Sequence, residues 1–150
     1  MSFKVEVVYV GAIHPAHISI VKLLLNNGKH ILCEKPLGMN VKETKEMLNL
    51  AKEKNLFFME AIWSRVQPSY LRLKEEIQKG SIGEVYHVQT EFGAYIPCDR
   101  MIKKELGGGA CLDIGIYCIQ LAQFVFDGET PNKVKLKISK LSCLCINFRR

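Results

Sequence analysis

Short apolar segments in the first 62 residues predict buried strands, and amphipathic segments between them predict helices. The expected strands span residues 5–10, 30–33 and 56–60. The expected helices span residues 17–27 and 41–54. Apolar residues of the first helix recur at the i, i+3, i+6, i+7 spacing of a helix packed on a sheet, at Ile18, Val21, Leu24 and Leu25. Asn40 is a candidate N-cap of the second helix, with Glu43 at the third helical position, as in a capping box. The alternation of strands and helices at short spacing predicts a parallel sheet with right-handed crossovers.

The pattern changes after Trp63, where a helix is expected over 68–79 and a one-face-wet strand of antiparallel character over 85–92. A loop over 93–107 then leads to a helix over 110–126 and a strand over 133–138. The change near residues 60–65 predicts a domain boundary. We therefore divide the chain into residues 1–62, residues 63–134 and a basic tail, 135–150.

Composition and charge indicate an ordinary globular protein, with 24% charged and 48% hydrophobic residues. The net charge of +6 comes from residues 133–150, which hold six basic residues and no acidic one, so the rest is neutral and gives no indication of nucleic-acid binding. The six cysteines form no CxxC pair, which favours reduced thiols and a cytoplasmic protein. Residues 1–4 have no apolar signal-peptide core, so no signal peptide is predicted. The longest apolar stretch, 107–126, begins with three glycines and contains Asp113, so no membrane span is predicted.

The ends of the three predicted parallel strands carry most of the candidate chemistry. Carboxyl ends of parallel strands meet at one edge of a sheet, where open α/β sheets bind ligands. The strand ends supply His14, then Glu34 and Lys35, then Glu60, Trp63 and Arg65. Pro36 biases Lys35 toward an extended backbone, and the sequence does not decide whether the Lys35–Pro36 bond is cis or trans.

Simpler interpretations stand beside each candidate. A strand-end lysine is usually solvated, and an apolar-helix tyrosine such as Tyr117 is usually a hydrogen-bonded core residue. Asp113, at i, i+4 from Tyr117, would only offset the helix dipole, and Trp63 and Phe92 would be core residues. His14 and His17 have no third ligand at a convincing spacing, so no metal site is predicted.

Together, the ordered motifs make the sequence resemble the Gfo/Idh/MocA oxidoreductase family from about residue 5 to about residue 134. The motifs are Val8-Tyr9-Val10-Gly11, His14-Pro15-x-His17, Gly28-Lys29-His30-x-Leu32-Cys33-Glu34-Lys35-Pro36, Met59-Glu60-Ala61-Ile62-Trp63-x-Arg65, and Gly107-Gly108-Gly109-Ala110-x-x-Asp113-x-Gly115-x-Tyr117.

The resemblance implies NADP-dependent oxidation of trans-dihydrodiols or aldoses such as D-xylose by hydride transfer. Lys35 and Tyr117 match the catalytic pair: a nearby ammonium favours the phenolate and lowers the tyrosine pKa, which suits a base for an alcohol proton. Asp113 would orient the substrate hydroxyls, and Trp63 and Phe92 would line the substrate pocket. Residues expected beside the cofactor are His14, Glu34, Lys35, Trp63 and Arg65. A homodimer is implied for the full-length form.

Compared with the family, the sequence departs at both ends. It has no G-x-G-x-x-G phosphate loop, and residues 135–150 do not resemble the family. The expected fold is therefore α/β: the C-terminal half of a Rossmann-like parallel sheet domain, then the start of an α+β domain whose antiparallel sheet ends after its first strand or so. Two functions stay open: a dehydrogenase, or a catalytically inactive truncated isoform that only associates with the full-length enzyme.

Overall fold

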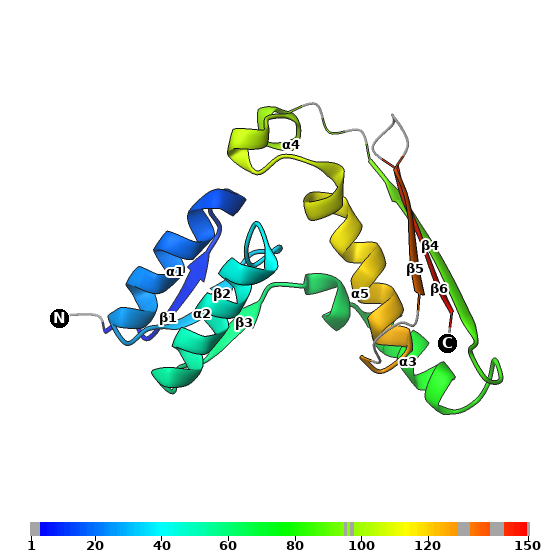
Figure 1. Ribbon diagram of the computed structural model, residues 1–150. Helices are drawn as coiled ribbons and strands as arrows, with labels where there is room; N and C mark the ends of the chain where they lie inside the picture. Colours follow the sequence, from blue (N-terminus) through cyan, green and yellow to red (C-terminus); the bar gives the residue numbers. More distant parts are fainter. Residues whose placement is uncertain (1–3, 95, 97, 129–132, 139–142, 150) are drawn as a thin grey trace. The chain divides into compact units, whose positions relative to one another are not determined.

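A three-stranded parallel sheet forms the centre of the first of two structural units. The computed structural model describes residues 4–94, 96, 98–128, 133–138 and 143–149. The first unit comprises the chain up to Ile62 together with Cys98–Gly109, and the second comprises the rest (Figure 1). The sheet order is β1 (Val7–Val10), β2 (His30–Cys33), β3 (Phe58–Glu60), so the predicted parallel topology is confirmed.

Both long helices of this unit pack on the same face of the sheet, as two consecutive crossovers of the same hand require. They are α1 (His17–Asn26), preceded by the short helix η1 (His14–Ala16), and α2 (Val41–Glu53). Val21 and Leu25 of α1 and Met47 of α2 are buried against Ile31 and Cys33 of β2, and all five side chains are fully inaccessible. The segment predicted as a loop over 93–107 contains two short helices of this unit, α4 (Asp99–Ile102) and η3 (Lys104–Leu106).

The second unit packs a helix on an antiparallel sheet. It begins with the short helix η2 (Trp63–Val66), followed by α3 (Pro68–Gln78) and β4 (His87–Gly93). A π-helical turn, η4 (Cys111–Gly115), leads into α5 (Ile116–Val125), where the sequence predicted one continuous helix. Cys118 and Ala122 of α5 are buried and pack with Val88 of β4.

The antiparallel sheet has three strands in the order β4-β6-β5, which corrects the expectation that it ends after its first strand or so. β5 (Lys133–Ile138) agrees with the predicted strand, whereas β6 (Cys143–Arg149) was not predicted. β6 lies between the other two and pairs antiparallel with both, so pairing on both sides supports it. Residues 139–142 and 150 of the predicted basic tail lie outside the described residues.

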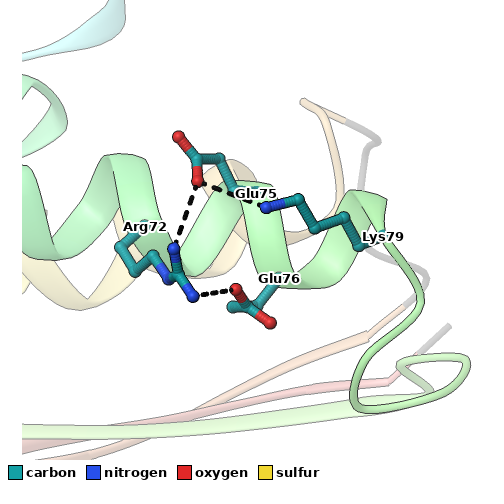
Figure 2. A network of polar contacts seen from close by, with 4 residues as sticks. All are labelled: Arg72, Glu75, Glu76 and Lys79. Carbon is teal, nitrogen blue, oxygen red and sulfur yellow. Dashed lines mark ion pairs between the residues drawn. The ribbon is translucent and has the colours of Figure 1, made fainter.

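Charged residues on α3 mark its solvent-facing surface (Figure 2). Arg72 forms ion pairs with Glu75 and Glu76, at 3.7 Å and 2.7 Å, and Lys79 forms one with Glu75 at 3.6 Å. Exposed pairs at i, i+3 and i, i+4 contribute only a few tenths of a kcal/mol each. These contacts identify the outer face of α3 and leave its other face for the packing described below.

Among the described residues, one helical stretch, Lys104–Val125, has the length and composition that would allow it to cross a membrane. Asp113 and Gln120 within it are buried polar residues, and α5 packs on β4. Of the most apolar 18-residue window of this stretch, 33% is buried in the structure.

Candidate functional site

The carboxyl ends of the three parallel strands hold the Glu34-Lys35-Pro36 motif in a hydrogen-bonded frame. The Glu34 amide donates to the Val10 carbonyl at 2.9 Å, and the Ala61 amide donates to the Cys33 carbonyl at 2.7 Å. The Lys35–Pro36 peptide bond is cis. Beyond it, the Leu37 amide donates to Glu60 Oε1 at 3.1 Å, so the end of β3 ties down the loop after Lys35. Lys35 itself is half-buried at this edge of the sheet.

His17, at the start of α1, holds the same loop from the helix side. Its Nδ1 lies 2.9 Å from the Pro36 carbonyl oxygen and its Nε2 lies 2.9 Å from the Ala12 carbonyl oxygen. The ring is fully buried. Both ring nitrogens therefore face backbone carbonyls, which gives His17 a structural role. Among the residues that the structure describes, no three histidine, cysteine, aspartate or glutamate side chains gather as a metal site.

His14, expected beside the cofactor, is buried with 3% exposure and contacts the glycine-rich segment. Its Nδ1 lies 3.1 Å from the Gly107 carbonyl oxygen, and its ring packs edge-on against His17 at 5.8 Å. Gly107 has φ +83°, and a Cβ there would lie 2.8 Å from the Cβ of His14 and the Cδ of Pro15. The close approach explains the glycine at position 107.

Glu34, also expected beside the cofactor, is engaged within the sheet edge. Its Oε1 accepts a hydrogen bond of 2.6 Å from the Tyr9 hydroxyl, and its Oε2 accepts one of 3.1 Å from the Lys35 amide. The hydrogen bond to Glu34 raises the pKa of the Tyr9 hydroxyl above its usual range. Glu34 thus fixes the backbone on which Lys35 stands.

The second unit contains a pocket of about 380 Å³ lined by both aromatic and polar residues. Trp63, Phe92 and Tyr117 are among its aromatic residues, and Ser64 and Tyr70 are among those that carry a hydroxyl group. The Trp63 indole Nε1 donates a hydrogen bond of 2.7 Å to the Tyr117 hydroxyl oxygen. The rings of Trp63 and Phe92 each meet the Tyr117 ring edge-on at 5.6 Å. The structure thus brings together three of the predicted site residues.

None of these three aromatic residues is buried in a core. Trp63 is 52% exposed and Phe92 is 39% exposed, while Tyr117 is half-buried. Exposed aromatic rings around a pocket are typical of a ligand-binding surface. The simpler interpretation of Trp63 and Phe92 as core residues is wrong.

Asp113 and Arg65 differ in their surroundings. Asp113 lies in the π-helical turn before α5 and is buried, with 3% exposure. Arg65 is exposed, with its guanidinium 5.9 Å from the centre of the Phe124 ring and its Nε bonded to Gln120 Oε1 at 3.2 Å. Lys35 belongs to the first unit and Tyr117 to the second, so their pairing stays a prediction.

Sequence reasoning missed a buried amide beside this pocket. Gln120 of α5 is 4% exposed, and its side chain bonds to Arg65, to Ser64 Oγ at 2.9 Å and to the Tyr70 hydroxyl at 3.2 Å. Its one sequence signal is a glutamine one turn after Tyr117 in the otherwise apolar start of the helix.

Comparison with protein families decides the family. Residues 1–62 match the model described as an oxidoreductase family with an NAD-binding Rossmann fold, and residues 70–142 match the GFO/IDH/MocA C-terminal domain. The chain belongs to the Gfo/Idh/MocA oxidoreductase family.

Relatives within the Gfo/Idh/MocA family include vertebrate proteins. The trans-1,2-dihydrobenzene-1,2-diol dehydrogenase of Xenopus tropicalis is 48% identical over 134 residues, which are 89% of this chain and 41% of that protein. The protein of the same name from Homo sapiens is 43% identical, over 89% of this chain and 40% of that protein. The chain thus spans about two fifths of the length of the curated relatives it matches.

Among solved Gfo/Idh/MocA-like structures, the aldose–aldose oxidoreductase from Caulobacter crescentus superposes with a TM-score of 0.80. It is 28% identical and covers 89% of this chain and 41% of its own. A levoglucosan dehydrogenase in complex with NADH and levoglucosan is 30% identical, with a TM-score of 0.76, and covers 90% of this chain and 38% of its own. These likenesses support the Rossmann-like fold.

A nicotinamide dinucleotide is the cofactor indicated by the matching Gfo/Idh/MocA model. The first unit offers chemistry that fits one end of such a molecule. Lys35 places an ammonium at the carboxyl edge of a parallel sheet, where this class of ligand binds, on a backbone held by Glu34 and His17. For the pyrophosphate, the sequence contains no G-x-G-x-x-G loop. Within the given sequence, the first unit therefore offers Lys35, and no phosphate loop of this kind, to such a cofactor.

Proposed function

We propose that the chain carries the acid–base machinery of an NADP-dependent dehydrogenase that oxidises a hydroxyl group of a trans-dihydrodiol or of an aldose such as D-xylose by hydride transfer. The observation that carries this proposal is the hydrogen bond from Trp63 to the oxygen of Tyr117 on the wall of the pocket. An indole N–H is a donor only, so the Tyr117 oxygen accepts. A hydrogen bond donated to that oxygen favours the phenolate over the phenol.

In this proposal, Tyr117 takes the proton of the substrate hydroxyl, and the ammonium of Lys35 stabilises the phenolate form that can do so. A lysine is suited to this task because it remains protonated while a tyrosine beside it ionises. Asp113 orients the neighbouring hydroxyls of the substrate. When bound, the cofactor supplies the hydride acceptor. Glu34, His14 and Arg65 lie beside it, and Trp63 and Phe92 flank the substrate.

The substrate class draws its support from the relatives. Their names refer to a trans-dihydrodiol and to an aldose, both of which carry adjacent hydroxyl groups. A pocket lined by both aromatic rings and hydroxyl groups suits such a molecule, which has apolar C–H faces and polar edges. The preference for NADP over NAD, a homodimer of the full-length form and a cytoplasmic location rest on the family resemblance and the reduced thiols.

The experiment is a titration of the purified 150-residue chain with NADPH, and separately with NADH. Trp63 is the only tryptophan, so exciting it and recording nicotinamide emission reports binding near the pocket. Saturable energy transfer is expected, and NADPH should reach half-saturation at a lower concentration than NADH. W63F, which lacks the tryptophan, should show no transfer. Turnover with NADP and D-xylose or a trans-dihydrodiol should fall by roughly 10²–10⁴ in Y117F, as when an acid–base group is removed. Equal turnover in Y117F and wild type would overturn the proposed role of Tyr117.

A second function, association with a longer relative without catalysis, is favoured by a different observation. Val7, Tyr9 and Met59 lie on one face of the parallel sheet and are 60%, 58% and 47% exposed. Parallel sheets are normally covered on both faces. The titration separates the two functions: a folded chain without energy transfer to either cofactor would contradict catalysis and favour association.

A further inference from the structure

Gln120 makes a buried polar connection between three elements of the second unit. Its side chain, on α5, contacts Ser64 and Arg65 of η2 and Tyr70 of α3. These partners lie 50 to 56 residues away in the sequence. The amide is 4% exposed and Ser64 is 3% exposed, so the Gln120–Ser64 contact is shielded from water.

The chemistry of the partners fixes the orientation of this amide. The Arg65 guanidinium can only donate, so the oxygen of Gln120 must face it, at 3.2 Å. The amide nitrogen then donates to Ser64 Oγ at 2.9 Å and to the Tyr70 oxygen at 3.2 Å. All three contacts are satisfied only in this orientation, and a polar network whose buried members are all satisfied favours one arrangement.

Gln120 joins the same two elements, η2 and α5, as the contact between Trp63 and Tyr117. Ser64 and Arg65 directly follow Trp63 in η2, and Gln120 follows Tyr117 by one turn of α5. Trp63 is half exposed, so water competes for its indole N–H. A single exposed hydrogen bond of this kind contributes little on its own. The shielded Gln120–Ser64 contact, with the part-buried bond to Arg65, holds the backbone from which Trp63 reaches Tyr117.

We propose that Gln120 is a positioning residue: it fixes the Trp63–Val66 turn on α5 so that the Trp63 indole stays bonded to Tyr117. Without Gln120, Ser64 and Arg65 lose their shielded partner and the turn detaches from α5. Among the described residues, Lys74 contacts Phe124 and Asp127, and the Tyr70 ring contacts the Phe124 ring, and these contacts do not involve η2. Arg65 of η2 also lies over the Phe124 ring, at 5.9 Å, but this is a cation–π contact of an exposed side chain. The relevance of this role for catalysis rests on the proposed function, whereas the contact itself does not.

The experiment measures time-resolved fluorescence anisotropy of Trp63, the single tryptophan, in the 150-residue chain without cofactor. Y117F removes the acceptor of the indole hydrogen bond and defines the fast local depolarisation of a released indole. Q120L has a similar volume and no polar atoms, and it should show the fast component of Y117F. Q120E should retain the wild-type decay, because its carboxylate accepts from Arg65 and from the Ser64 and Tyr70 hydroxyls, which turn to donate.

K74M is the matched control, because it removes another polar link between α3 and α5 and leaves Gln120 intact. It should keep the wild-type anisotropy. If circular dichroism shows that Q120L does not fold, Q120N carries the test, since its amide is too short to reach all three partners.

Three results would overturn the proposal. The first is wild-type anisotropy in the folded Gln120 variant, and the second is wild-type anisotropy in Y117F. The third is release of the indole by K74M to the same extent as by Q120L, which would indicate general loosening. Because no cofactor or substrate is present, failure here is distinct from failure of the dehydrogenase proposal.

Discussion

Cys33, the residue before Glu34, makes the stability of the first unit sensitive to alkaline pH. Burial is the main cause that raises the pKa of its thiol to about 12 from an ordinary 9.0, with smaller contributions from the Glu60 and Glu34 carboxylates. Above pH 9 the unfolded chain releases this proton while the folded chain keeps it. The contribution is therefore complete below pH 9 and is lost as the pH rises toward 12.

We expect the free energy of unfolding to fall over this range by up to about 1.4 kcal/mol per pH unit from Cys33 alone. The raised pKa of Tyr9 acts in the same direction, so the comparison must isolate the thiol. Urea unfolding of wild type and C33A at several pH values provides it. C33A should be less stable throughout, from lost packing, but with a shallower decline above pH 9. Parallel declines would contradict the assignment.

For single residues, the sequence predicted only those site residues that belong to ordered motifs. Lys35, Trp63 and Tyr117 stand in recognisable motifs, and the structure places Trp63 against Tyr117. Gln120 has no such signal. Its role depends on residues 64–70, which come close only after α3 and α5 have packed. One glutamine in an apolar helix does not by itself predict partners.

The contact between α1 and the loop after β2 depends on His17. H17L keeps an apolar filling of similar size but removes the ring nitrogens that lie 2.9 Å from the Ala12 and Pro36 carbonyl oxygens, one of which accepts a hydrogen bond from the neutral ring. Each buried carbonyl that loses its hydrogen bond costs roughly 1–3 kcal/mol. We therefore expect H17L to lower the free energy of unfolding by a few kcal/mol and to loosen the segment carrying Lys35.

Urea unfolding measures the stability of H17L, and hydrogen exchange at the Leu37 amide measures the loop. S19A is the control, because Ser19 lies on the exposed side of the same helix and its hydroxyl donates to the Ala16 carbonyl. Such exposed substitutions usually change stability by less than about 0.5 kcal/mol. An H17L chain as stable as S19A, with unchanged exchange at Leu37, would show that His17 does not hold the loop.

Local chemistry predicted some elements and missed others. The helix start at Asn40 is confirmed: its side chain accepts from the Glu43 amide at 3.0 Å, and Glu43 Oε2 accepts from the Met39 amide. The strand Cys143–Arg149 was not predicted, although Leu144, Ile146 and Phe148 alternate in its sequence, because it lies beyond the segment that resembles the family. The π-helical turn before α5 was missed because apolar spacing does not separate it from an α-helix.

At the scale of the whole molecule, the feature with the largest expected effect is the exposed apolar face of the parallel sheet. Both crossover helices cover one side of β1–β2–β3, and the other side presents Val7, Tyr9 and Met59. Register aligns Tyr9 with Leu32 and Leu32 with Met59, so these side chains form one continuous strip. β1 is also an edge of the described sheet. Exposed apolar strips beside a strand edge promote association.

We expect the 150-residue chain to associate as its concentration rises, and the double variant V7K/M59K to remain monomeric, because lysine on this face opposes burial against another apolar surface. Sedimentation velocity over a concentration series measures both. V41K is the control: Val41 is 69% exposed at the first position of α2, away from the strip, so the variant should associate like wild type. If wild type stays monomeric, the strip does not drive association. If V41K suppresses association as strongly as V7K/M59K, added charge and not the sheet face is responsible. Association that V7K/M59K alone abolishes would identify this face as the surface that a partner must cover.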